Sequence, residues 1–80
     1  MVIKIQGQEE GPIPTERVVT IATTTGKEDV VVHTSQVSGD GIEVGFIKNQ
    51  EDGRSVLVEL PRETVTGRWR VWVPSTAVAR

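Results

Sequence analysis

The side chains of this sequence that could do chemistry are few. His33 and Ser35 lie two positions apart, which in a strand places both on one face. An activated serine needs a base within hydrogen-bond reach, whereas two positions along a strand span about 6.5–7 Å. This spacing therefore indicates ordinary strand residues rather than a nucleophile and its base.

Metal binding has equally little support, because His33 is the one histidine and there is no cysteine. Zinc sites need cysteine or histidine clusters, and a calcium-binding loop needs acids at alternate positions before a glycine. The acids here stand singly in strands or occupy turns, as Asp40 and Asp52 do. We therefore expect no metal site, no cofactor and no catalytic residue.

Arginine and tryptophan are interleaved in the segment 68–72, whose sequence is RWRVW. In a strand, Trp72 shares one face with Arg68 and Arg70, while Trp69 falls on the other face with Val71. Guanidinium groups beside an indole ring suit cation–π contacts and the binding of carboxylates, peptides or nucleic-acid bases. The Trp72 face is therefore a candidate binding surface.

The composition indicates that β strands position these residues. Valine, isoleucine and threonine fill 29 of the 80 positions, whereas leucine, alanine and methionine fill only 6. β-Branched side chains suit a pleated sheet and lose rotamer freedom in a helix. Apolar runs between glycine-containing turns predict strands at 2–6, 17–24, 29–37, 41–48, 55–61 and 67–73, with an extended loop at 7–16 and one helical turn at 74–77.

A chain of this length makes a single domain, spanning 1–80. We predict an all-β fold of five or six antiparallel strands in meander order, which form a small barrel or a tight sandwich. The turns at 38–41 and 51–53 place Gly41 and Gly53 where we expect a positive φ.

Two turns fix the register of the last three strands. If residues 51–53 form a three-residue loop, Phe46 faces Val58, and if 62–67 close the next hairpin, Val58 faces Val71. A slip of one residue would move every side chain to the other face. The predicted core wall consists of Val44, Phe46, Val56, Val58, Leu60, Trp69, Val71 and Val73.

On the opposite face the same register aligns Ile47, Leu57 and Trp72 in a row across three strands, and Glu59 faces Arg70. An apolar stripe bordered by charge is typical of a surface that associates. The candidate binding residues are Trp72, Arg70, Arg68, Leu57 and Ile47.

The sequence leaves open what covers this stripe. Ile13 stands between Pro12 and Pro14, so the loop 7–16 is one candidate lid over Trp72. A second subunit is the other, because a two-fold dimer needs only one self-complementary patch. We expect self-association, as a homodimer or closed oligomer, or binding to another protein.

Charge is distributed unevenly along the chain. Residues 1–53 carry four basic and nine acidic residues, net −5, and residues 54–80 carry five basic and two acidic residues, net +3. The overall charge of −2 argues against broad capture of nucleic acid. The basic last third keeps nucleic-acid binding as an alternative, through Arg54, Arg62, Arg68, Arg70 and Trp72.

No run of about 18 apolar residues is present, so we expect no membrane span. The first residues lack the charged region and long apolar stretch of a secretory signal. Together with the absence of cysteine, this favours a cytoplasmic protein.

The last residues, GRWRVWVPSTAVAR at 67–80, resemble the final strand pair and closing turn of Src-homology-3-like small β-barrels. Those domains commonly end in a hydrophobic residue, Pro-Ser, a short 3₁₀ turn and a valine strand, which correspond here to Val73, Pro74, Ser75, 76–77 and Val78. The segment GDGIEV at 39–44 is similar to another stretch of the family. The resemblance implies small-barrel architecture. It does not imply proline-peptide binding, because the family's groove needs tyrosines and this chain has none.

We therefore expect a non-catalytic binding or assembly module that acts through protein–protein contacts. Nucleic-acid binding is the alternative, and a third class is an enzyme whose site forms only at an oligomer interface.

Overall fold

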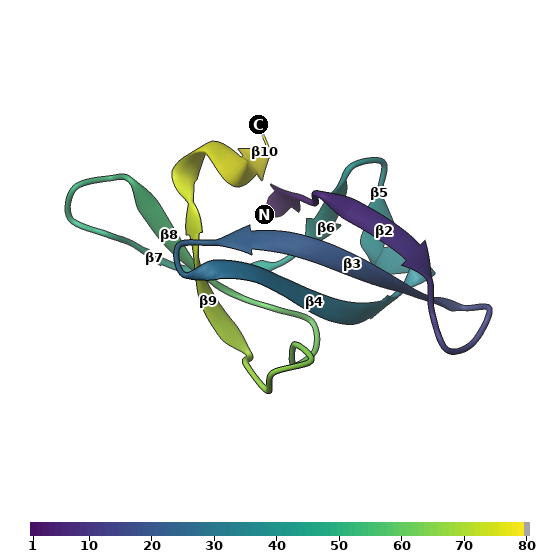
Figure 1. Cartoon of the computed structure of the whole chain (residues 1–80). Helices are drawn as coiled ribbons and strands as arrows, with labels where there is room; N and C mark the ends of the chain where they lie inside the picture. The colour runs from purple at the N-terminus through teal and green to yellow at the C-terminus, as the bar shows by residue number, and fades with distance from the viewer. Residues whose placement is uncertain (80) are drawn as a thin grey trace.

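A computed structural model describes residues 1–79 and shows an all-β protein (Figure 1). Two 3₁₀ turns interrupt the strands, η1 (Thr34–Gln36) and η2 (Ser75–Ala77). The second of these confirms the predicted turn before Val78. The strands are β1 (Val2–Lys4), β2 (Gly7–Glu10), β3 (Glu16–Thr23), β4 (Gly26–His33), β5 (Val37–Ser38), β6 (Gly41–Glu43), β7 (Gly45–Asn49), β8 (Ser55–Glu59), β9 (Arg70–Pro74) and β10 (Val78–Ala79).

The strands form three small antiparallel sheets, in the orders β10-β1-β6-β5, β2-β3-β4 and β7-β8-β9. β6 and β7 are two halves of one run that is broken at Val44, so this run takes part in two sheets. The all-β, antiparallel prediction is confirmed. Only two of the three sheets follow the predicted meander, because β1 pairs with β6 and β10, which lie far away in sequence.

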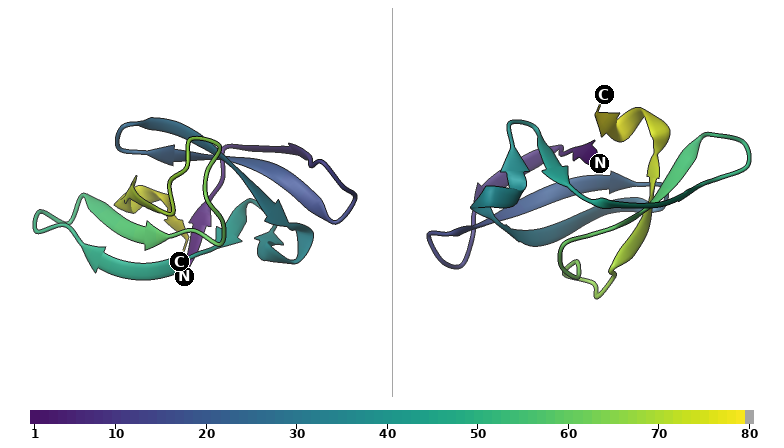
Figure 2. Two further views of the ribbon diagram at one scale, coloured as in Figure 1. Left: turned by 90° about the horizontal axis from the view of Figure 1, so that it is seen from below. Right: turned by 180° about the vertical axis from the view of Figure 1, so that it is seen from behind.

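The two prolines led us to predict one extended loop over residues 7–16, and this prediction is wrong. β2 pairs with β3 from Gly7 opposite Thr20 to Glu10 opposite Arg17. The prolines follow this strand, so the backbone donors of β2 remain free to pair. The loop itself is restricted to 11–15 and lies at the opposite end of the molecule from the β7–β8 turn (Figure 2).

The strand predicted at 29–37 begins earlier and ends earlier, as β4. It ends at His33 because this residue caps η1. The backbone N–H of Ser35 donates to His33 Nδ1 at 3.0 Å, and the His33 N–H donates to Gln36 Oε1 at 2.9 Å. These two bonds satisfy backbone donors at the start of the turn.

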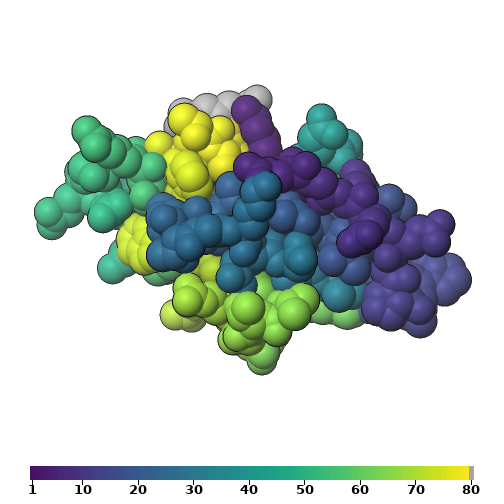
Figure 3. Space-filling model, in the orientation of Figure 1, coloured from purple at the N-terminus to yellow at the C-terminus, as the bar shows by residue number. Residues whose placement is uncertain are grey.

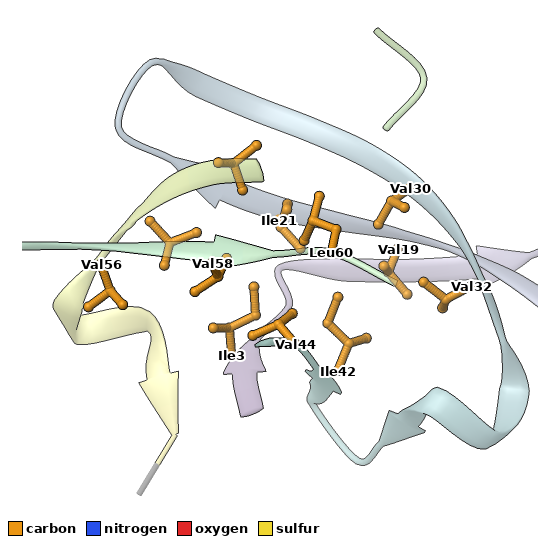
Figure 4. Packing of buried hydrophobic residues seen from close by; sticks show 12 residues of the cluster. Ile3, Val19, Ile21, Val30, Val32, Ile42, Val44, Val56, Val58 and Leu60 are labelled. Carbon is orange, nitrogen blue, oxygen red and sulfur yellow. The ribbon is translucent and has the colours of Figure 1, made fainter. Parts of the chain in front are cut away.

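One buried cluster unites the three sheets, and its side chains point toward one another (Figure 4). Six of the eight residues of the predicted core wall belong to it, namely Val44, Val56, Val58, Leu60, Val71 and Val73. Ile3, Val19, Ile21, Val30, Val32 and Ile42 supply the rest.

The two aromatic residues of the predicted wall are not in the core. Phe46 is 52% exposed and Trp69 is 50% exposed. Phe46 lies on β7, one of the two edge strands of its sheet. Trp69 precedes the first residue of β9, and its carbonyl accepts the Leu60 N–H at 2.8 Å, so it lies at the last paired position before the connection.

The predicted register is correct along β8 and β9, but between β7 and β8 it is correct only at Gly45 and Phe46. The predicted three-residue loop 51–53 is wrong, because the Gln50 N–H donates to the carbonyl of Ser55 at 2.9 Å and the loop spans 51–54. Phe46 faces Val58, and Val58 faces Val71, as predicted. A β-bulge between Phe46 and Lys48 then shifts the pairing, so that Lys48 rather than Ile47 lies opposite Leu57. One extra residue in an edge strand is enough to produce this change.

The turn glycines agree with expectation at Gly53, whose φ is +72°. In the turn before β6 the positive φ falls instead on Gly39, at +57°, and not on Gly41. Gly41 is needed for another reason: a Cβ there would lie 2.5 Å from Val2 Cγ1 of the neighbouring strand. The glycine lets β1 and β6 approach closely.

The connection between β8 and β9 folds back over the edge of β4, and Figure 3 shows this yellow-green segment against the blue strands. Thr64, which is buried, forms a bridge with Val30, and the Val65 N–H donates to the Asp29 carbonyl at 2.8 Å. Arg62 also pairs with Glu16 at 2.5 Å. This contact joins the basic last third of the chain to its acidic first part.

Glu28 of β4 contacts this connection and has a lowered pKa. The Thr66 hydroxyl donates to Glu28 Oε1 at 2.5 Å. Hydrogen bonds from Thr66 and Thr64 lower the pKa of Glu28 below its ordinary value, and the charge of Arg68 adds to the effect. A carboxylate that accepts hydrogen bonds is favoured over the protonated acid.

Thr66→Val is expected to raise the pKa of Glu28 toward its ordinary value, whereas Thr66→Ser keeps the hydroxyl and the low pKa. A lowered pKa in the folded state stabilises the protein above the pKa of the unfolded state. That stabilisation is lost as the pH falls through the folded value. NMR titration of the Glu28 side-chain carboxyl carbon measures both variants. An unchanged midpoint in Thr66→Val would contradict the assignment.

Candidate functional site

The predicted apolar stripe is only partly assembled. Leu57 of β8 lies directly opposite Trp72 of β9, and both are half-buried. The bulge places Lys48 rather than Ile47 opposite Leu57, and Lys48 Nζ lies 5.9 Å from the centroid of the Trp72 ring. The row across the three strands is therefore Lys48, Leu57 and Trp72, with a cation at its edge.

The two predicted arginines lie in different environments. Arg70 is on β9, where its Nε lies 3.5 Å from Glu59 Oε1 across the sheet, as the register predicted. Arg68 belongs to the connection before β9, and its backbone N–H donates to Thr64 Oγ1 at 3.1 Å. The structure therefore brings Arg70, but not Arg68, onto the strands that carry Trp72.

The sequence left open whether the loop 7–16 covers Trp72, and the structure does not support this alternative. Ile13 is half exposed at the tip of the 11–15 loop, at the far end of the molecule from the β7–β8 turn (Figure 2). The β3–β4 turn contacts the backbone of Trp72 instead, where the Thr24 N–H donates to the Trp72 carbonyl at 2.9 Å.

A groove of about 700 Å³ lies next to the other tryptophan. It is lined by residues of η1, of the bend between β6 and β7 and of the end of β8, together with Trp69. The lining residues are Ser35, Gln36, Glu43, Val44, Gly45, Glu59, Leu60, Pro61 and Trp69.

The groove combines an aromatic side chain with carboxylates. Trp69 Nε1–H donates to Glu63 Oε1 at 2.7 Å, which fixes the plane of the exposed indole ring. Glu43 and Glu59 lie in the lining itself, and the Met1 ammonium pairs with Glu43 Oε1 at 3.1 Å. The Arg70 side chain pairs with Glu59 outside this set, but both are more than half exposed, so the pair is weak. The groove therefore has one aromatic side chain and two carboxylates, each of which has a cationic partner.

The sequence pattern missed Trp69 as a site residue because strict alternation grouped it with Val71 and Val73. Its position next to the 62–67 turn was the available indication of exposure, since pairing ends near turns. Glu63, which holds the indole, also belongs to that turn region.

His33 and Ser35 are closer than strand spacing predicted. η1 folds Ser35 back, so that its Oγ lies 2.7 Å from His33 Nδ1. The same nitrogen also accepts the Ser35 backbone N–H, so the contact forms part of the cap of η1. Within 1–79 no group of three or more metal-ligating side chains is present, and no helix is long and apolar enough to cross a membrane.

No protein-family model matches the chain, and no match was found among curated proteins or solved structures.

Proposed function

We propose that this protein is a non-catalytic module that binds another protein, with the groove beside Trp69 as its contact surface. The observation that carries the proposal is Trp69 itself, half exposed yet held by a hydrogen bond to Glu63. Tryptophan is enriched among the residues that dominate protein interfaces. A ring that is already fixed loses less entropy when a partner binds.

The exposed strand edges favour side-chain contacts over pairing with a partner's strand. β7 carries a bulge and Lys48 at its edge, and β2 carries Gln8, Glu9 and Glu10, all of them exposed. Bulges and charged side chains are the usual means of preventing edge pairing. The groove is therefore the better-supported contact surface.

The proposed relationship to Src-homology-3-like barrels agrees with the strand arrangement. The closing segment runs through β9, η2 and β10, in the order that the resemblance implies, and β10 returns to pair with β1. The groove beside Trp69 has no tyrosine, so we propose a contact surface that differs from the family's peptide groove. A cytoplasmic location is part of the same proposal.

Nucleic-acid binding through the arginine and Trp72 face is the second candidate. Lys48 lies over the Trp72 ring, which supports a stacking surface with a cation. Against it, Arg62 is paired with Glu16 and Arg70 with Glu59. The local excess of positive charge is thereby reduced.

Display selection of twelve-residue random peptides on the wild-type domain tests the proposal. We expect binders whose affinity falls at least about tenfold in Trp69→Ala, since hot-spot truncation costs about 2 kcal/mol or more. Val65→Ala removes another exposed apolar side chain of the same connection and is the control. Binders that are indifferent to Trp69→Ala would contradict the proposed surface.

We also propose that the protein binds a second copy of itself. Light scattering of the wild-type domain tests this self-association. A dimer that Trp72→Glu dissociates would place the contact on the Leu57 and Trp72 row. A mass near 8.7 kDa at all micromolar concentrations would exclude self-association in this range.

A further inference from the structure

The turn over residues 64–68 determines which group lies beside the Trp69 indole. The Thr64 N–H donates to the Arg68 carbonyl at 2.8 Å, which closes the turn. Glu63 and Trp69 flank the turn, one on each side, so the closed turn places them next to each other. The hydrogen bond from Trp69 Nε1–H to Glu63 Oε1, at 2.7 Å, therefore depends on the turn.

Two threonine hydroxyls link this turn to β4. The lowered pKa of Glu28 keeps it ionised at neutral pH, and a carboxylate only accepts, so the Thr66 hydroxyl donates to Glu28 Oε1 at 2.5 Å. Thr66 Oγ then has no second proton and accepts the Thr64 hydroxyl at 3.1 Å. Thr64 Oγ in turn accepts the Arg68 N–H at 3.1 Å. The donors of this chain therefore all point one way, from the main chain of Arg68 to the Glu28 carboxylate.

The surroundings of the chain leave few replacements for its members. Thr64 is 4% exposed, so water has little access to it. If its hydroxyl turned away, the part-buried Arg68 N–H would lose its side-chain acceptor, which is costly. The hydroxyls of Thr66 and Thr64 both lower the pKa of Glu28, as expected for protons directed toward a carboxylate.

Main-chain hydrogen bonds hold the rest of the connection without the Glu28 side chain. The Val65 N–H donates to the Asp29 carbonyl at 2.8 Å, and the Leu60 N–H donates to the Trp69 carbonyl at 2.8 Å. The connection should therefore stay on the edge of β4 when the hydroxyl chain is broken. What is lost is the fixed geometry of the turn, and with it the contact between the indole N–H and its carboxylate partner.

We infer that Glu28 is a positioning residue of the Trp69 surface, because its carboxylate ends the hydroxyl chain that closes the turn between Glu63 and Trp69. Glu28 stands 38 positions before Thr66 in the chain and does not line the groove, so it acts only through the two threonines. The effect on binding rests on the proposed function. The position of the ring, by contrast, can be measured without a ligand.

Trp69 fluorescence in the Trp72→Phe background tests the inference, because this background leaves one tryptophan. Thr66→Val and Glu28→Ala each break the chain without altering a buried residue. We expect both to lower the steady-state anisotropy of Trp69 emission and to increase its quenching by acrylamide. Display-selected peptides that depend on Trp69 should bind these variants about two- to tenfold more weakly, because the ring must be ordered again on binding.

Conservative variants should restore the wild-type behaviour. Thr66→Ser keeps the hydroxyl, and Glu28→Gln keeps an acceptor oxygen, so both should match the wild type in anisotropy and quenching. Thr25→Val is the matched control, because it removes an exposed hydroxyl in the β3–β4 turn whose contact is Thr23 Oγ. It should leave Trp69 emission unchanged.

The spectra are recorded without denaturant, where the domain is folded. A merely structural role of Glu28 would lower the urea midpoint but leave the anisotropy and quenching of the folded state unchanged. Unchanged values in both Thr66→Val and Glu28→Ala would overturn the inference, as would an equal change in Thr25→Val. The proposed function would stand in those cases if display selection still gave binders dependent on Trp69. Binders indifferent to Trp69, with the expected spectra, would overturn the proposed function and support the positioning role of Glu28.

Discussion

Replacing Ile3 by alanine is expected to lower the free energy of unfolding by about 2–5 kcal/mol. Domains of this length have about 4–12 kcal/mol in total, so a large share of the stability would be lost. Ile3 is fully buried in β1, opposite Ile42 on one side and Val78 on the other. Its side chain therefore packs where the first and last parts of the chain meet. Urea unfolding followed by circular dichroism measures the change.

Phe46→Ala is the matched comparison, because alternation alone assigned Phe46 to the core. A half-exposed side chain on an edge strand leaves little cavity when it is truncated, so we expect a loss below about 1 kcal/mol. If Phe46→Ala destabilises the domain as much as Ile3→Ala, the Phe46 side chain is buried in solution and not half exposed.

Gly41→Val is expected to destabilise the domain by at least about 1–3 kcal/mol, the usual cost of overpacking. A Cβ at this position would lie 2.5 Å from Val2 Cγ1 and 3.1 Å from the Ile3 carbonyl oxygen. Val2 and Ile3 belong to β1, so relief requires β1 to move away from β6. The midpoint of urea unfolding reports the loss.

Gly45→Val is the control on the same run of chain. A Cβ there would meet Glu59 Cβ at 3.6 Å, an ordinary contact distance. Glycine is also a poor strand residue, so valine should be neutral or slightly stabilising. If Gly45→Val is the more damaging of the two, close approach of β1 and β6 is not what requires glycine at 41.

The sequence predicted the pairing of β8 with β9 because local turn chemistry determines which residues face each other. The β7–β8 turn is one residue longer than predicted, since the Gln50 N–H donates to the Ser55 carbonyl, and Phe46 faces Val58 only because the bulge compensates for this residue. The bulge after Phe46 has no comparable local cause in the sequence. Because of the bulge, Lys48 and not Ile47 lies opposite Leu57, so one residue of the predicted binding surface is different.

Alternating apolar residues identify which face of a sheet is buried, but they do not show how far along the strand the burial extends. The carbonyl of Trp69 accepts the Leu60 N–H, as the predicted register requires, yet Trp69 lies at the end of the sheet and is half exposed. β2 was missed for a related reason, because its sequence GQEE has no apolar residue to indicate a strand. Its pairing with β3 depends on backbone hydrogen bonds that the side-chain pattern does not reveal.

The position of β1 between β6 and β10 has a consequence for how the protein folds. The β3–β4 hairpin and the β7-β8-β9 sheet join neighbours in sequence, so their loops close at little entropic cost. β1 instead meets partners at 41–43 and 78–79, the latter nearly the whole chain away. Such non-local pairing slows folding. During synthesis Ile3 therefore stays without its full set of neighbours until the last strand has left the ribosome, and the local hairpins form first.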